Sequence, residues 1–285
     1  MSKVIVVTDS TTYIPEELKN KFPLETVPLV VIWGAEQYLD GVDITPNQFY
    51  TRLQTAETMP STSQTTPNTF KVMYEKLLAE GFDIISMHIS SKLSGTMDSA
   101  IQAKAILKSD RIEIIDSEST GMALGFQALT VARAAANGAT LKDCVKLAHK
   151  VKEQTGILFA VQTLEFLHRG GRIGGAAAFL GTMLNLKPIL ELREGRIEAA
   201  GKVRTMNKAI DKTVEMMKEK INGNTPIRIA VQHANAYEEA QKLLDKIIRS
   251  FPENSISESL IAEVSPVIGT HLGPGAIGIS FMYGI

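Results

Sequence analysis

Ser94, Gly95 and Thr96 lie between a run typical of a buried strand, residues 83–90, and a run typical of an amphipathic helix. Backbone N–H groups are unpaired at the start of a helix, and the helix dipole favours negative charge there. A strand-to-helix turn that also carries hydroxyls is therefore suited to hold an anion. The alternative is a plain helix cap formed by Ser94, because serine is commonly used that way.

Polar residues also follow other predicted strands, namely Thr8 and Asp9 after the first and Asp116 and Ser117 after a later one. In doubly wound sheets, ligands bind outside the carboxyl ends of the strands. Together with Ser94, these residues predict a polar crevice at that edge. Each of them could instead cap a helix.

Two side chains in the second half of the chain could add positive charge. His271 precedes Leu-Gly-Pro-Gly, and we expect its ring to be held by a tight loop rather than by a helix. Arg172 follows two glycines, which let the backbone approach a ligand while the guanidinium binds an oxyanion. An ordinary glycine-rich entry to a helix is the alternative for the Arg172 segment.

The elements that must position these residues alternate between strand and helix over residues 1–155. This alternation predicts an N-terminal α/β, Rossmann-like domain with a doubly wound parallel sheet. Over residues 156–285, a hairpin turning at Glu194 and Gly195 is mixed with helices, which predicts a C-terminal α+β domain with a mixed or partly antiparallel sheet. Two domains are also the expectation for a chain of 285 residues.

Composition excludes several classes of protein. The formal net charge is −1, with 30 basic and 31 acidic residues, so no global field attracts nucleic acid or an anionic membrane. The sequence has no run of 18 apolar residues, and its first residues are typical of a strand rather than a signal peptide. The single cysteine, Cys144, cannot form an internal disulfide, which favours a cytoplasmic location.

Standard catalytic and metal-binding signatures are missing from the sequence. It has no G-x-S-x-G elbow, no Walker A loop, no G-x-G-x-x-G after the first strand and no C-x-x-C or H-x-x-x-H pair. We therefore expect no catalytic residue, no metal and no cofactor.

Seven segments in order, TDST, STSQ, SSKLSGT, IDS, RGGRI, LKPIL and HLGPGAIG, resemble the DegV family, and the likeness spans residues 4–283. Better-understood members resemble the fatty-acid-binding subunit of bacterial fatty acid kinase. The resemblance implies a two-domain, non-enzymatic protein that binds a long-chain fatty acid such as palmitate in a buried tunnel. It also implies that Thr62 and Ser94 hold the carboxylate between the domains, with His271 close by. We expect Thr62 and Ser94 both to sit at helix starts.

Further expectations follow from this resemblance. The N–H groups of Gly95 and Thr96, a protonated His271 and the guanidinium of Arg172 would assist in binding the carboxylate. The segment 174–192, rich in small and apolar residues, would line the tunnel, although it could equally be plain core. A separate ATP-binding kinase subunit and an acyltransferase are the implied partners. Ser61 stands where the family commonly has a basic residue and His168 where it often has Lys, which puts the partner in more doubt than the ligand.

Two other functions fit the residues and stay open. A serine hydrolase could use Ser94 as nucleophile and His271 as base. A phosphosugar-binding protein could hold its phosphate at a helix start.

Overall fold

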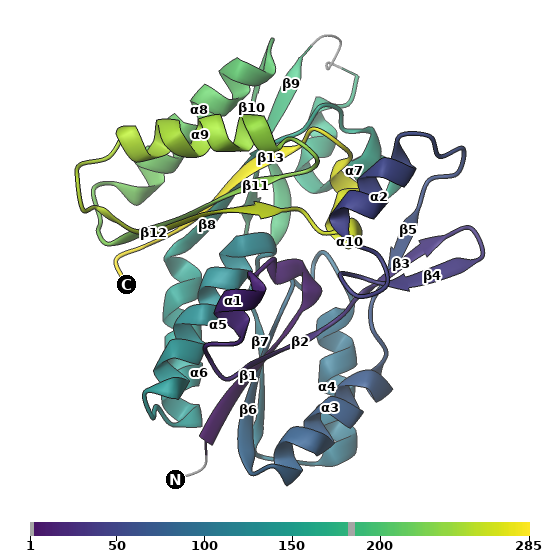
Figure 1. The fold of residues 1–285 in the computed structure, drawn as a ribbon, viewed down its shortest axis with the longest axis vertical. Helices are drawn as coiled ribbons and strands as arrows, with labels where there is room; N and C mark the ends of the chain where they lie inside the picture. Colours follow the sequence, from purple (N-terminus) through teal and green to yellow (C-terminus); the bar gives the residue numbers. More distant parts are fainter. Residues whose placement is uncertain (1–2, 182–185) are drawn as a thin grey trace.

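The first sheet is parallel throughout and has the strand order β2-β1-β6-β7 in the computed structural model, which describes residues 3–181 and 186–285. Helices cover both faces of this sheet (Figure 1), because successive side chains of β1 point to opposite sides. Ile5 and Val7 pack under α3 and α4, whereas Val4 and Val6 pack under α5 and α6. The predicted doubly wound parallel sheet is confirmed. Its elements are β1 Lys3–Asp9, β2 Leu24–Val27, α3 Pro67–Ala79, β6 Phe82–His88, α4 Thr96–Leu107, β7 Ile112–Asp116, α5 Gly121–Ala136 and α6 Leu141–Glu153.

The second sheet is mixed, with the strand order β10-β9-β8-β13-β11-β12. Only β11 and β12 are parallel neighbours among its described strands. Helices α8 and α9 cover one face of it, and α5 packs against the other face, so the nearly all-buried α5 lies between the two sheets. The predicted mixed C-terminal sheet is confirmed. Its elements are β8 Thr155–Ala160, β9 Lys187–Arg193, β10 Arg196–Val203, α8 Met206–Ile221, β11 Ile227–His233, α9 Tyr237–Arg249, β12 Ile256–Glu263 and β13 Ile277–Tyr283.

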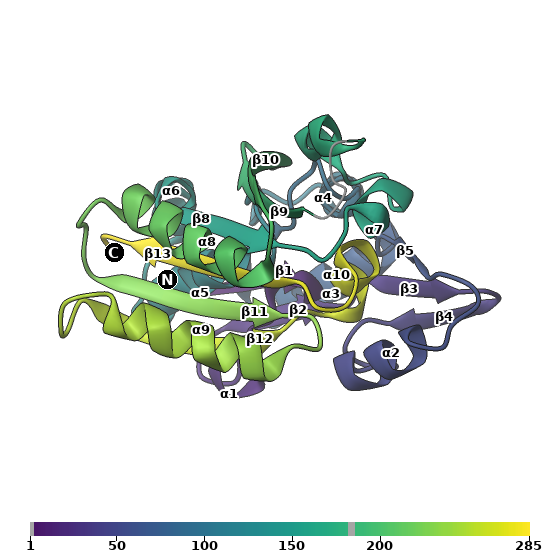
Figure 2. The same ribbon diagram turned by 90° about the horizontal axis from the view of Figure 1, so that it is seen from above.

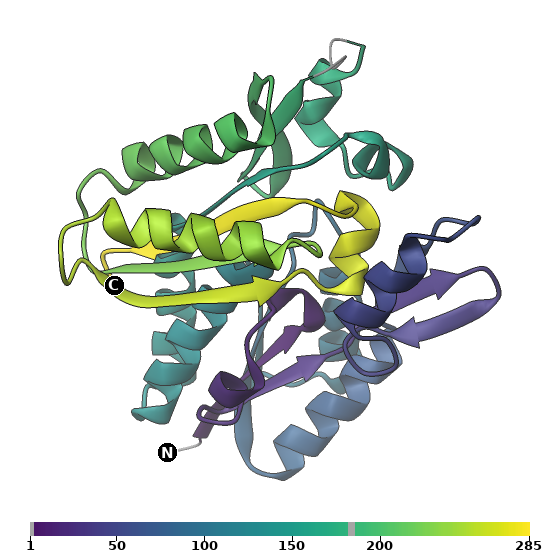
Figure 3. The same cartoon turned by 45° about the horizontal axis from the view of Figure 1, so that its top comes forward.

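A third, three-stranded antiparallel sheet projects from the side of the molecule, as both Figure 2 and Figure 3 show. Residues 24–33 form two strands, β2 and β3, which are separated at Pro28. Proline has no N–H to give to a ladder, so this division is expected where one sheet ends and another begins. The elements are β3 Val30–Trp33, β4 Glu36–Leu39, α2 Pro46–Leu53 and β5 Ser61–Ser63.

The tip of the hairpin β9–β10 joins the C-terminal sheet to the turn before α4. Glu194 and Gly195 both have positive φ, as the predicted tight hairpin turn requires. The hydroxyl of Ser90 donates to the carbonyl of Gly195 at 2.8 Å, and Lys92 Nζ donates to the carbonyl of Glu194 at 2.6 Å. These contacts hold the two sheets together beside Ser94. The domain boundary near residue 155 stays a prediction.

The remaining elements are short. None of the helices within residues 3–181 and 186–285 combines the length and the apolar character needed to cross a membrane. Cys144 is buried on α6, as expected, and burial raises the pKa of its thiol to about 11. The short elements are η1 Ser10–Thr12, α1 Glu16–Lys19, α7 Glu165–Arg169, η2 Gly174–Phe179 and α10 Pro266–Leu272.

Candidate functional site

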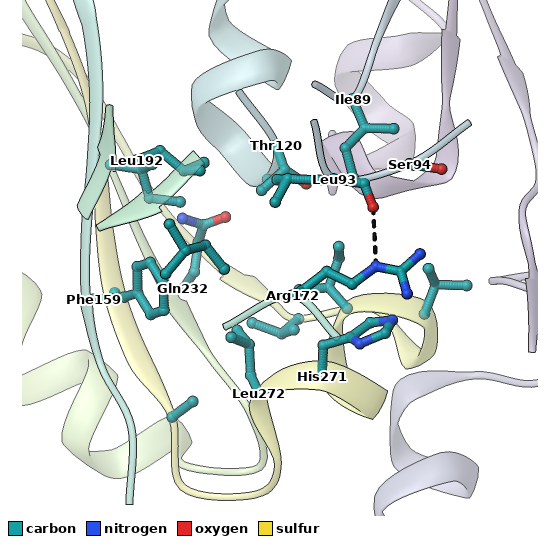
Figure 4. Close-up of a pocket in the computed structure, with 18 of the residues that line it drawn as sticks. Ile89, Leu93, Ser94, Thr120, Phe159, Arg172, Leu192, Gln232, His271 and Leu272 are labelled. Atoms are coloured by element: carbon teal, nitrogen blue, oxygen red, sulfur yellow. Dashed lines mark hydrogen bonds between the residues drawn. The ribbon is translucent and has the colours of Figure 1, made fainter. Parts of the chain in front are cut away.

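A pocket of about 180 Å³ lies where the three sheets meet. Figure 4 shows Ser94, Arg172 and His271 at one end of it, and Leu192, Phe159 and the amide of Gln232 toward the opposite end. The rest of the wall is mainly apolar, which suits a ligand with a polar head and a long apolar tail. Its apolar members are Leu29, Ile89, Leu93, Ile157, Phe159, Leu167, Leu192, Ile197, Val264, Val267, Ile268, Leu272, Ala276 and Ile277.

Thr62 reaches the polar end from β5, where it pairs with Val31 of β3. Its hydroxyl Oγ1 lies 2.9 Å from Nε2 of His271. The expectation that Thr62 sits at a helix start is wrong, because the residue that caps α3 is Thr66. A strand position fixes the Thr62 side chain through the ladder and points it at the pocket.

Ser94 lines the pocket just before α4, as predicted. Its Oγ accepts a hydrogen bond from the N–H of Thr96 at 3.3 Å and lies 2.8 Å from the Thr96 hydroxyl. Gly95 and Thr96 were also expected to bind the ligand, but neither lines the pocket. Thr96 is fully buried with its N–H bonded to Ser94, and the side chain of Gln64 covers Gly95. The pocket does not reach these two residues, and the role of their N–H groups in binding stays a prediction.

Arg172 brings a positive charge to the polar end of the pocket. Its Nε donates to the carbonyl of Leu93 at 3.1 Å, and its Nη1 donates to the carbonyl of Gly170 at 2.7 Å. Figure 4 shows the first of these bonds and places the guanidinium between Ser94 and His271. Because two carbonyls hold it, the guanidinium is preorganised for an anion.

His271 lies in the last turn of α10, so the expectation that a loop holds it is wrong. Gly269 in the same helix is needed for packing: a Cβ there would lie 2.6 Å from the hydroxyl of Tyr50 on α2. Gly170 has a similar role on the other side of the imidazole. A Cβ at Gly170 would lie 2.0 Å from Nδ1 of His271. Two glycines thus let the helix and its histidine approach their neighbours closely.

The protein groups around His271 favour its neutral form, and the expected protonation beside a bound carboxylate stays a prediction. Burial, and then the positive charge of Arg172, lower the pKa of His271 to about 4. Its Nδ1 is buried and has no hydrogen-bond partner among the described residues. The imidazole is therefore neutral near pH 7 and acts through the hydrogen bond at Nε2.

This charge state predicts the titration of His271 in ligand-free protein. We expect its imidazole NMR signals to show a neutral ring from pH 6 to 8, with a midpoint near pH 4. Because the folded-state pKa lies below the ordinary value of 6.5, the unfolded state takes up its proton first as the pH falls. His271 therefore removes stability as the pH falls from about 6.5 to 4. His271→Asn, which assigns the signals by removing them, should lose this part of the pH dependence. A midpoint at or above pH 6 would refute the neutral-ring assignment.

Gln64, Thr120 and Gln232 also line the pocket, although none of them was predicted to bind the ligand. Oε1 of Gln232 accepts from the N–H of Met122 at 2.8 Å and so caps α5 from β11. Thr120 stands at the N-cap of α5 but makes no cap bond, and its hydroxyl is buried without a partner among the described residues. The signal that could have indicated Gln232 is its place directly after the apolar residues 229–231, near the end of a strand.

The predicted polar crevice does not form as a single site. Thr8, Asp9, Asp116 and Ser117 do not line the pocket that Ser94 lines. The Asp9 carboxylate is buried and accepts from the N–H groups of Thr11 and Ile89, so its role is structural. Backbone N–H groups in and beside the turns already donate hydrogen bonds to the carboxylates of Asp9 and Asp116.

The segment 174–192 was expected to line the tunnel, and this is wrong for most of its described residues. Only Leu192 among them lines the pocket, whereas Ala176 packs in the core beneath it. Residues 182–185 of the segment lie outside the described residues. No group of three residues in the described part of the chain is arranged to hold a metal ion.

Together, the parallel sheet, the mixed sheet and the pocket between them define a two-domain α/β protein with a mainly apolar binding site. The family model described as an uncharacterised protein of the DegV family matches residues 3–284, and the chain belongs to that family. A DegV domain-containing protein of Halalkalibacterium halodurans is 38% identical over 285 residues, covering 99% of each chain.

Two solved structures resemble this one closely. The first is a DegV family protein from Thermus thermophilus, described for its fatty acid binding, with a TM-score of 0.93, 34% identity and 99% of each chain covered. The second is DegV from Bacillus subtilis, described as a fatty acid binding protein, with a TM-score of 0.89 and 35% identity. That comparison covers 99% of this chain and 100% of the other.

Proposed function

We propose that this protein binds one long-chain fatty acid, such as palmitate, with the carboxylate at the polar end of the pocket. The observation that carries this proposal is the division of the pocket into a polar end, with Thr62, Ser94, Arg172 and His271, and a long apolar remainder. The fatty acid binding described for the two relatives, at 34% and 35% identity, supports it.

The two ends of the pocket have different energetic roles. Burying about 15 methylenes at ~0.8 kcal/mol each gives on the order of 12 kcal/mol before the costs of binding. A hydrogen bond to a charged group contributes about 1.5–3 kcal/mol. The acyl tail therefore drives affinity, and the head group fixes orientation.

At the head group, the neutral His271 decides what Thr62 can donate. A neutral imidazole has one N–H, and if this is at Nε2 it donates to Oγ1 of Thr62 across the observed 2.9 Å. The hydroxyl proton of Thr62 is then available to the carboxylate. Ser94 adds a second hydroxyl, and Arg172 supplies the opposite charge without which a buried carboxylate is costly.

Removing one donor at a time tests this arrangement. Thr62→Val and Ser94→Ala should each weaken palmitate binding by roughly tenfold to a hundredfold, because each removes a hydrogen bond worth about 1.5–3 kcal/mol. The measurement is a binding titration of delipidated protein, with thermal melting to show that each variant is folded. Ser94→Ala should also lower stability slightly, since Ser94 accepts from the N–H of Thr96.

Thr66→Val is the control for this experiment. Thr66 caps α3 by accepting from the N–H of Thr69, and it does not line the pocket. Its loss should cost about 1 kcal/mol of stability and leave affinity unchanged. Wild-type affinity in both Thr62→Val and Ser94→Ala would rule out the head-group assignment.

The alternative functions are not favoured. A serine hydrolase needs Ser94 hydrogen-bonded to its base, but Nε2 of His271 bonds Thr62, and Nδ1 has no partner among the described residues to orient the ring. A phosphosugar has no apolar tail, so it would not pack against the apolar wall of the pocket. Native mass spectrometry distinguishes these functions. A co-purified ligand with a mass in the range of palmitate or oleate would support only fatty acid binding.

Presentation of the fatty acid to a separate ATP-binding kinase subunit, and transfer onward to an acyltransferase, form the wider part of the proposal, with simple lipid transport as the other possibility. The buried free thiol of Cys144 supports a reducing, cytoplasmic location.

A further inference from the structure

Two further pockets share wall residues with the tail end of the main pocket. They have volumes of about 90 Å³ and about 220 Å³. Ile157 on β8 and Leu192 on β9 line both of them and line the main pocket as well. These two side chains therefore form a shared partition.

The partition is at the end of the pocket opposite the head group. Figure 4 places Leu192 and Phe159 far from Ser94, Arg172 and His271. Ile157 lies two residues before Phe159 on β8, so both side chains point to the same face of the sheet. An acyl chain whose carboxylate is at Arg172 thus runs toward Ile157 and Leu192.

The far side of the partition is polar. The smaller cavity carries Glu118 and Lys152, which form an ion pair at 2.8 Å. The larger cavity carries Glu191 and Lys220, which form another at 2.8 Å. A methyl group that passed the partition would enter a charged environment and gain no apolar burial.

We infer that Ile157 and Leu192 form the end wall that sets the maximum length of the bound acyl chain. This inference rests on the proposed fatty acid function. Each methylene buried before the wall raises affinity by roughly fourfold. Affinity should therefore rise with chain length until the methyl end meets these side chains, and stop rising beyond that length.

The experiment compares binding of saturated fatty acids with 12 to 20 carbons to delipidated protein. Leu192→Ala removes part of the wall and should move the best-bound length upward by about two carbons or more. Ile157→Phe thickens the wall and should move it downward. Leu192→Val removes a smaller part of the side chain and is the variant to test if Leu192→Ala does not fold.

Val264→Ala is the matched control, because Val264 is buried and lines the main pocket but neither of the other cavities. It should weaken binding of all lengths by a similar factor without moving the best-bound length. An unmoved optimum in the Ile157 and Leu192 variants, or an equal shift in Val264→Ala, overturns this inference alone. Failure of wild-type protein to bind any of the acids overturns the proposed function and the inference together.

Discussion

Replacing Arg172 with methionine should weaken fatty acid binding by roughly a hundredfold to a few thousandfold. Methionine keeps most of the apolar stem but removes the charge at the head-group end of the pocket. Leaving one member of a buried charge pair without its partner costs about 3–5 kcal/mol. A titration with palmitate measures the loss. The pKa of His271 should rise in the same variant, because the charge of Arg172 contributes to lowering it.

Two controls separate charge from position. Arg172→Lys retains the charge but cannot hold the carbonyls of Leu93 and Gly170 in the same way, so its affinity should be intermediate. Arg169→Met removes a nearby exposed guanidinium that pairs with Glu165 and does not line the pocket, and it should bind normally. Equal losses at Arg169 and Arg172 would show that only the overall charge matters.

Gly170→Ala should reduce binding by roughly a hundredfold or more. Its new Cβ would lie 2.0 Å from Nδ1 of His271, so the ring must move away from Thr62. Such overpacking costs about 1–3 kcal/mol, and the lost orientation of the Thr62 hydroxyl adds about 1.5–3 kcal/mol. The checks are a palmitate titration and the NMR signals of His271, which should shift in ligand-free protein.

The neighbouring glycine provides the control. Gly171 has φ of +69° and no atom within 4 Å of an added Cβ. Gly171→Ala should therefore lose about 1 kcal/mol of stability through backbone strain and retain its affinity. If both variants lose binding equally, disturbance of the loop rather than contact with His271 is the cause.

Much of the fold could be predicted from the sequence because its signals are local. The alternation of apolar runs with helices predicted the parallel sheet, and the predicted hairpin turn at Glu194 and Gly195 is where both residues have positive φ. The split at Pro28 and the third sheet were missed, since a short strand pair carries little periodicity. Helix α10 was missed because the Gly-Pro-Gly that follows Leu272 indicated a loop around His271, whereas the helix ends just before it.

The site was predicted in part. Thr62, Ser94, Arg172 and His271 do line one pocket. The charge of His271 was not predictable from its neighbours in sequence, because burial and a guanidinium 99 positions away determine it. The pocket wall was misplaced for the same reason: segment 174–192 has the right composition, but only Leu192 of its described residues lines the pocket, whereas strands β8 and β13 and helix α10 supply eight lining residues.

The polar end of the pocket is assembled from β5, the turn before α4, the residues after α7, and α10, which lie far apart in the chain. A ligand bound there contacts all four at once and binds only when they are assembled. By mass action, such a ligand stabilises the folded chain by RT ln(1 + [L]/Kd), about 2.7 kcal/mol at a hundredfold excess over Kd. The melting temperature of this protein therefore depends on the fraction of molecules with ligand bound in the pocket. A preparation in which only some molecules carry lipid from the expression host will melt as a mixture of two species.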